Sequence, residues 1–272
     1  MNELQDKAKK LGLRAVMADW EHYAKQDWLA PFIEAEGLAR DKHGLERRIK
    51  EAKIGQFKQM SQFDWDWPKI IDRDQVEDLF SLDFLKEKAN VVLMGGNGIG
   101  KTMIAQNLAH QVVTRGHTTR FVKASQMLNQ LLQCRDATAR AYSLKKYCSY
   151  ELLVIDEVGY MNYDNRYADL LYEVISGRYL NRSTIVTTNK SYKDWGEIFP
   201  NAACVVTLVD RLVHNAESVV VDGESYRAKE AQERAAAKQK ERNARKKNKK
   251  PTPNTAAALV GEKTNAKSPS AA

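Results

Sequence analysis

The clearest chemical signal in this 272-residue sequence is a glycine-rich stretch, GGNGIGKT, at residues 95–102. It fits the phosphate-loop pattern G-x-x-x-x-G-K-[ST]. Glycines let the main chain approach a phosphate closely, so that the N–H groups of residues 98–102 form an anion-binding nest. Lys101 would place its charge between the β- and γ-phosphates, and the Thr102 hydroxyl would bind Mg²⁺. The predicted ATP-binding residues are Gly95, Gly96, Asn97, Gly98, Ile99, Gly100, Lys101 and Thr102.

Two acidic residues follow an apolar run about fifty residues later, in the stretch LLVIDE at residues 152–157. Asp156 is predicted to hold Mg²⁺ through water, and Glu157 to act as the general base that polarises the attacking water. Ligands collect at the carboxyl ends of parallel strands, so these acids and the glycine-rich loop are expected to meet there.

Asn189 ends a further apolar run, STIVTTN. Its amide is predicted to orient the water between Glu157 and the γ-phosphate. The alternative is that Asn189 only forms a turn, which is a common role for asparagine.

The elements that must position these residues alternate between strands and helices. Apolar runs predict strands at 90–94, 119–123, 152–155 and 183–188, and helical spacing predicts helices at 102–114, 125–132 and 167–180. Strands that are apolar on both faces indicate a parallel sheet covered by helices on each side. The fold class is therefore α/β, a three-layer P-loop domain.

Composition divides the chain into three expected regions. Residues 1–65 read as a small helical module, 66–227 as the nucleotide-binding domain, and 228–272 as a basic, disordered tail with a transient helix over 229–240. The stretch FDWDWP at 63–68 is predicted to be a linker whose rings pack on the next domain, with base stacking by Trp65 and Trp67 as the alternative.

Charge and apolar content limit where the chain works. The tail holds twelve basic and four acidic residues, which leaves 31 of each sign in residues 1–227. Neither an apolar run of membrane-spanning length nor a secretory signal is evident, and the three cysteines form no C-x-x-C pair. These features predict a cytoplasmic protein that contacts no membrane.

The ordered motifs resemble those of AAA+ ATPases, and most closely the IstB type that accompanies insertion-sequence transposases. The resemblance extends over about residues 1–230 and includes LLVIDEVGY (152–160), RSTIVTTN (182–189), LVDRLVH (208–214) and GESYR (223–227). Replicative helicase loaders of the DnaC type share much of the ATPase portion. The chain departs from the family pattern at Gly96 and Asn97, where the loop often carries proline.

The resemblance implies two further roles. Arg211 matches the arginine finger that reaches the γ-phosphate bound by a neighbouring subunit, and Arg227 matches the sensor 2 arginine of its own subunit. Both residues have the alternative of simple surface ion pairs. The family also implies duplex DNA, a transposase and ATP-dependent self-association as partners; helicase loading in replication is the alternative function, and a nucleotide kinase is a weaker one.

Local charge favours DNA as a partner. Seven basic and three acidic residues lie between Arg40 and Lys58, and Lys7, Lys9, Lys10 and Arg14 form a second cluster. Such clusters neutralise backbone phosphates without reading bases, so binding is expected to tolerate sequence. The alternative is that these charges form a solvated helix face.

Overall fold

The computed structural model describes residues 3–160, 165–199 and 203–248. Its centre is a five-stranded sheet, β2-β3-β4-β1-β5, in which every neighbouring pair of strands is parallel. The strands are β1 (Asn90–Gly95), β2 (Thr119–Lys123), β3 (Leu152–Val158), β4 (Ser183–Thr188) and β5 (Ala216–Val221). The predicted α/β class is confirmed, and β5 is added to the four strands predicted from the sequence.

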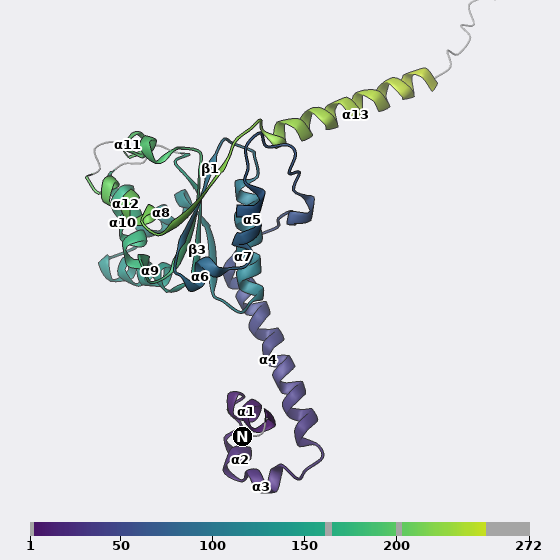
Figure 1. The fold of residues 1–272 in the computed structure, drawn as a ribbon, viewed down its shortest axis with the longest axis vertical. Helices are drawn as coiled ribbons and strands as arrows, with labels where there is room; N and C mark the ends of the chain where they lie inside the picture. Colours follow the sequence, from purple (N-terminus) through teal and green to yellow (C-terminus); the bar gives the residue numbers. More distant parts are fainter. Residues whose placement is uncertain (1–2, 161–164, 200–202, 249–272) are drawn as a thin grey trace, which may run out of the picture. The chain divides into compact units, whose positions relative to one another are not determined.

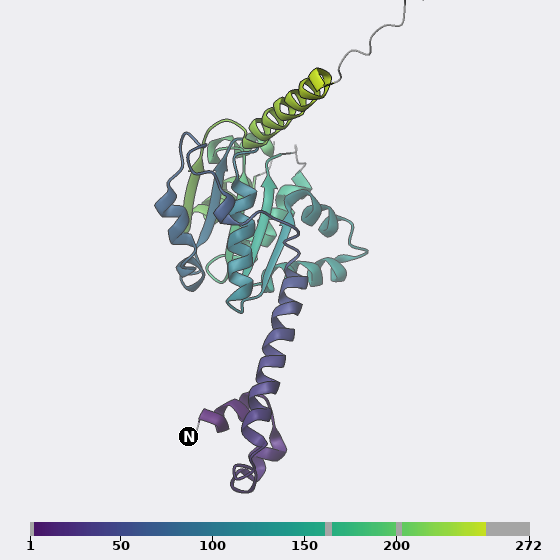
Figure 2. The same cartoon turned by 90° about the vertical axis from the view of Figure 1, so that its right-hand side faces the viewer.

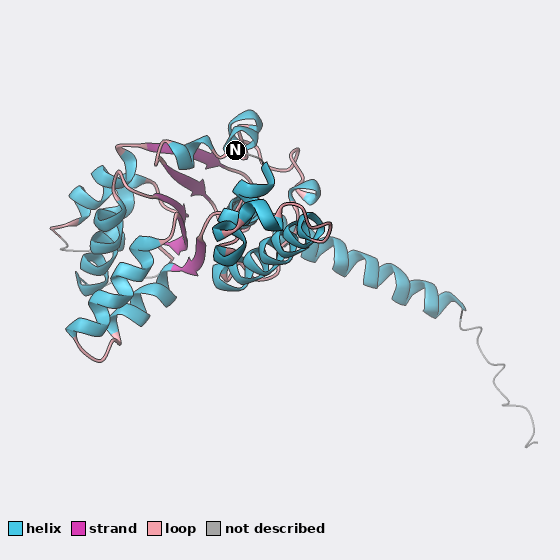
Figure 3. Cartoon of the chain, turned by 90° about the horizontal axis from the view of Figure 1, so that it is seen from below, coloured by secondary structure: helices cyan, strands magenta, loops and turns pink. Residues whose placement is uncertain are grey.

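Helices cover both faces of the sheet (Figures 1 and 3). Side chains alternate across each strand, so Val91 and Leu93 join one apolar core while Val92 joins the other. On the first face lie α5 (Arg73–Leu79), α6 (Asp83–Lys86) and α7 (Lys101–Thr114). On the second lie α8 (Ala124–Leu132), α9 (Ala137–Ser149), α10 (Asn165–Arg178), α11 (Trp195–Ile198) and α12 (Val205–Val213), with the 3-10 turn η2 (Tyr192–Asp194) before α11.

The N-terminal residues form four helices, α1 (Glu3–Lys10), α2 (Arg14–Ala18), α3 (Trp20–Tyr23) and α4 (Leu29–Ala52). Ala8, Leu29 and Ile33 form a small buried cluster among them. The last turn of α4 packs on α7 and β2, where Gln106 Nε2 donates to the Ile54 carbonyl at 3.0 Å (Figures 1 and 2). The boundary expected near residue 65 remains a prediction.

The segment between α4 and α5 contains a 3-10 turn, η1 (Met60–Gln62), followed by the FDWDWP stretch. Phe63 and Trp65 pack against the core on the α7 face, and Trp67 Nε1 donates to the Glu224 carbonyl at 2.8 Å. The rings are thus used in packing, as expected for a linker fixed to the domain.

The chain divides into a compact unit up to Arg227 and a second unit that begins at Ala228. The helix α13 (Tyr226–Asn248) is longer than the helix predicted over 229–240. Alanine, lysine, arginine and glutamate dominate it and have high helix propensity, which accounts for its length. The disorder predicted for residues 249–272 lies outside the described residues. None of the described helices is long and apolar enough to cross a membrane.

Candidate nucleotide-binding site

The glycine-rich loop connects the end of β1 to the start of α7. Gly98 and Gly100 adopt left-handed conformations, with φ of 77° and 107°. A Cβ on Gly98 would lie 2.2 Å from Ser225 Oγ, and one on Gly100 would lie 2.5 Å from the Phe63 ring. In the described structure, no main-chain carbonyl accepts from the amides of residues 98–102. These amides and the N-terminus of α7 form a site suited to an anion.

Lys101 is the cation of this loop and is only 4% exposed. Its Nζ donates to the carbonyls of Gly95 at 2.7 Å and Gly96 at 2.5 Å. Burial lowers the pKa of Lys101 to about 8, although the negative charge of Asp156 opposes the shift. At neutral pH the ammonium group therefore keeps its charge for most of the time, as phosphate binding requires.

Asp156 lies at the end of β3 and is almost fully buried. Its Oδ1 accepts hydrogen bonds from Thr102 Oγ1 at 3.0 Å and from Thr187 Oγ1 at 2.5 Å. Burial raises the pKa of the Asp156 carboxyl, while the two hydroxyl donors hold it down. The loop threonine and the strand carboxylate thus share one point, and these are the oxygen ligands that a hard cation such as Mg²⁺ prefers.

Glu157 sits in a β-bulge. Ile155 pairs with Val186 and Val158 pairs with Thr188, so Asp156 and Glu157 together face Thr187 alone. Glu157 has φ of 63°, and its N–H donates to Thr187 Oγ1 at 2.9 Å. The bulge turns its carboxylate toward β2, where Glu157 Oε2 lies 2.8 Å from Lys123 Nζ.

Asn189 follows the last residue of β4. Its side-chain oxygen is buried and has no hydrogen-bond partner among the described residues. A Cβ on Gly159, just beyond β3, would lie 3.5 Å from that oxygen. Asn189 therefore lies beside the segment that follows Glu157, with its oxygen free for a ligand or water, and its catalytic role stays a prediction.

Comparison with known proteins identifies the family, because residues 3–234 match the family described as IstB-like ATP binding protein. The chain belongs to this IstB-like family. An assigned ATP-binding protein of insertion sequence IS21 from Pseudomonas aeruginosa is 32% identical over 205 residues, covering 75% of this chain and 77% of that protein. One of IS232 from Bacillus thuringiensis subsp. berliner is 33% identical over 191 residues, covering 70% and 76%.

The solved structure of DnaI has the same fold, with a TM-score of 0.50 and 16% identity over 60% of this chain and 90% of that chain. At that identity the likeness concerns the fold alone. It agrees with the parallel sheet and identifies the IstB-like chain as an AAA+ protein.

Of the two arginines implied by the IstB-like resemblance, Arg227 lies at the loop and Arg211 does not. Arg227 Nε would be 3.1 Å from a Cβ on Gly98, and its charge contributes to the lowered pKa of Lys101. Arg211 lies on α12, where its guanidinium stacks over the rings of Tyr172 at 5.1 Å and Tyr179 at 5.8 Å. A finger for a neighbouring subunit must lie away from its own nucleotide, so this position leaves that role a prediction.

Two residues of the IstB-like site were not predicted from the sequence. Thr187 is inside an apolar strand run, where it reads as a buried β-former, and Lys123 ends a short strand far from the acids in sequence. A threonine that faces the bulged strand, or a lysine at the carboxyl end of an adjacent strand, carries meaning only when the strand order is known. No local pattern marks either of them.

Proposed function

We propose that this protein binds and hydrolyses Mg²⁺-ATP, assembles on duplex DNA in an ATP-dependent oligomer, and helps to recruit a transposase during DNA transposition. The observation that carries the proposal is the hydrogen-bonded set of Thr102, Asp156 and Thr187 beside Lys101. It joins the phosphate loop to the carboxylate that ends β3, which is the arrangement needed for a magnesium-bound triphosphate.

Each residue of the loop has a defined task in binding. The amides of residues 98–102 receive the β- and γ-phosphate oxygens, and Lys101 exchanges its carbonyl acceptors for phosphate oxygens. Mg²⁺, when bound, would neutralise developing charge on the phosphates, with Thr102 Oγ1 and Asp156 as its protein ligands. Among the described residues no group of three or more His, Cys, Asp or Glu forms a metal site. That fits an ion held by one carboxylate, a hydroxyl, phosphates and water.

Hydrolysis requires a water aligned with the γ-phosphorus. In the proposed step the water oxygen attacks phosphorus, the bond to the ADP oxygen breaks, and the water proton passes to Glu157. Lys123 holds the Glu157 carboxylate in an ion pair, so the carboxylate must leave that pair in part to receive the proton. Asn189 has a free, buried oxygen beside residue 159, from which it can orient the water.

ATP-dependent assembly follows from the arginines. Arg227 contacts the loop of its own subunit and reports whether a phosphate is present. Arg211 lies on a separate helix and is proposed to reach the γ-phosphate of a neighbouring copy. A contact of this head-to-tail kind generates rings or open helices.

DNA and transposase enter the proposal through charge and family. The relatives that match most of this chain are named as ATP-binding proteins of insertion sequences. The basic residues of α4 and of the chain just beyond it suit phosphate contacts that tolerate any base sequence.

The test measures ATP hydrolysis and assembly with three proteins: the wild type, Lys101→Ala and Glu157→Gln. Lys101→Ala is expected to lose ATP binding, and Glu157→Gln to bind ATP but remain in the assembled state in sedimentation. Duplex DNA is expected to raise the wild-type ATPase rate. The proposal fails if the wild type takes up no labelled ATP in the presence of magnesium, or if Glu157→Gln gains no mass with ATP.

A further inference from the structure

A basic groove lies at the edge of the sheet opposite the nucleotide site. It is formed where α4 ends, β2 begins and α9 ends, and its volume is about 650 Å³. Five cationic side chains and one carboxylate line it. They are Arg47, Lys50, Lys53, Arg120 and Lys146, against Glu51.

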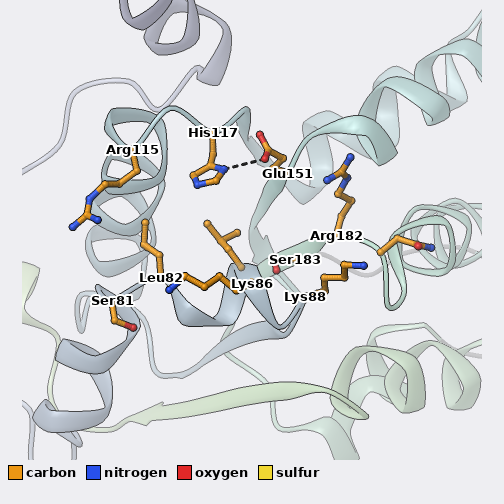
Figure 4. Close-up of a pocket in the computed structure, with 11 residues that line it drawn as sticks. Ser81, Leu82, Lys86, Lys88, Arg115, His117, Glu151, Arg182 and Ser183 are labelled. Carbon is orange, nitrogen blue, oxygen red and sulfur yellow. Dashed lines mark hydrogen bonds and ion pairs between the residues drawn. The ribbon is translucent and has the colours of Figure 1, made fainter. Parts of the chain in front are cut away.

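A second basic pocket of about 210 Å³ adjoins the first (Figure 4). Its cations are Lys86, Lys88, Arg115 and Arg182, which surround the opening in Figure 4. The single carboxylate, Glu151, is engaged by His117 Nδ1 at 2.9 Å and by the Thr118 N–H at 2.8 Å. It therefore does not pair with any of the four cations.

The two hollows are continuous along the chain. His117 lines the pocket and Thr118 the groove, just as Glu151 lines the pocket and Tyr150 the groove. Because all five strands are parallel, their amino ends share one edge of the sheet, and both hollows lie along it. We call these nine cationic residues, in the groove and pocket together, the amino-edge strip.

The strip concentrates charge that the rest of the unit balances. It contains nine basic side chains against two carboxylates, whereas residues 1–227 contain equal numbers of both signs. Lys88, Arg115, Lys146 and Arg182 are all exposed, and no described acidic group pairs with them. Such charges, held apart from acids, favour a polyanion.

The lining favours a duplex over a single strand. Base stacking needs exposed aromatic faces, yet the only ring residues that line the strip are His117 and Tyr150. His117 is paired with Glu151, and both rings are half-buried. Lysine and arginine without stacking partners suit the phosphates on the outside of a duplex.

Arg178 fixes the backbone that presents the strip. It is 1% exposed and donates to the carbonyls of Tyr147 and Tyr150, each at 2.8 Å, and to that of Ser183 at 2.5 Å. It thereby ties the end of α9, next to Lys146, to the start of β4, next to Arg182. A strip whose cations are held by a rigid backbone loses less entropy on binding than one on mobile loops.

We propose that the amino-edge strip is the surface along which the phosphate backbone of duplex DNA lies, so that ATP and DNA bind at opposite edges of the same sheet. The proposal rests on the DNA binding proposed above and assigns it to specific residues. It extends the DNA surface from α4 into the ATPase domain. DNA at one edge is then linked to ATP at the other through the strands themselves.

The test compares two variants in which glutamine replaces four exposed cations. The strip variant carries Lys88→Gln, Arg115→Gln, Lys146→Gln and Arg182→Gln. The matched control carries Lys69→Gln, Arg140→Gln, Arg166→Gln and Lys193→Gln, which are exposed cations outside both hollows. Binding of a fluorescein-labelled duplex of mixed sequence is measured by anisotropy as salt is raised, with ATP present.

Each lost phosphate contact reduces the slope of log affinity against log salt by about 0.9. The strip variant is therefore expected to show a slope smaller by about 3 and at least tenfold weaker binding at low salt. The control variant is expected to match the wild type, and all three proteins should bind ATP equally.

The outcomes separate the inference from the proposed function. If the wild type binds no duplex, the DNA function fails and the inference with it. If the wild type binds and the strip variant keeps the same slope, the inference alone is overturned, and the strip then serves an acidic protein. Should the strip variant misfold, Glu51→Gln provides the second test, because removing this carboxylate must strengthen duplex binding; no change would contradict the proposal.

Discussion

Thr187→Val is the sharpest test of how the site is built. The Thr187 hydroxyl lies in β4 between β3 and β1, donating to Asp156 Oδ1 at 2.5 Å and accepting from the Glu157 N–H at 2.9 Å. Valine has nearly the same shape and the same preference for strands, so the change removes two hydrogen bonds without opening a cavity.

The expected loss follows from those two bonds. A hydrogen bond to a charged group contributes about 1.5–3 kcal/mol, and an unpaired buried N–H costs about 1–3 kcal/mol. Water can reach the half-buried Glu157 and recover part of the second term. We therefore expect Thr187→Val to lower the free energy of unfolding by about 2–3 kcal/mol. The control, Thr187→Ser, keeps the hydroxyl and loses one methyl group, at a cost of about 1 kcal/mol.

Activity should respond to Thr187→Val as well. The hydroxyl lowers the pKa of the Asp156 carboxyl, which burial has raised. Without it the pKa rises further, so the acid limb of the Mg²⁺-ATPase profile is expected to move to higher pH. The assays are urea unfolding followed by tryptophan fluorescence, and ATPase rate against pH. Equal stability and coincident pH profiles for the valine and serine variants would refute this reasoning.

Three more predictions follow from the same site. Asp156→Asn should raise the unfolding temperature of the nucleotide-free protein at pH 7 by about 2–4 °C, as expected for ~1 kcal/mol. The raised pKa means that the carboxyl favours folding below its unfolded value and loses this contribution as pH rises through the folded value, so a gain that persists at pH 3 would contradict it. Lys123→Met should change the free energy of unfolding by less than about 1 kcal/mol, because the ion pair is part-exposed. Its ATPase rate without DNA should rise severalfold since Glu157 is released, and an unchanged or lower rate would count against the pairing. Because the pKa of Lys101 is lowered to about 8, its charge is lost above that pH. ATP affinity, measured with a fluorescent analogue, should then fall by about tenfold from pH 7 to pH 9; a flat titration would show that Lys101 does not bind phosphate.

The sequence by itself determined the local parts of this protein. The glycines and Lys101 are adjacent in the chain, and an apolar run directly precedes Asp156 and Glu157. Strands and helices adjoining such motifs are specified by nearby residues, so the α/β class, four of the strands and the phosphate loop were predictable. The family likeness rested on the same ordered motifs.

Only the tertiary structure decided which distant residues meet. The order β2-β3-β4-β1-β5 places Thr187 between the loop and Asp156, and it sets Lys123 beside Glu157. The bulge that faces Thr187 with two acids is a matter of register, which the apolar pattern of β3 does not reveal. Strand pairing joins segments far apart in the sequence, and its outcome depends on how whole helices and strands pack. For the same reason the amino-edge strip, drawn from α4, β2, α9 and the loops before the strands, is visible only in the folded chain.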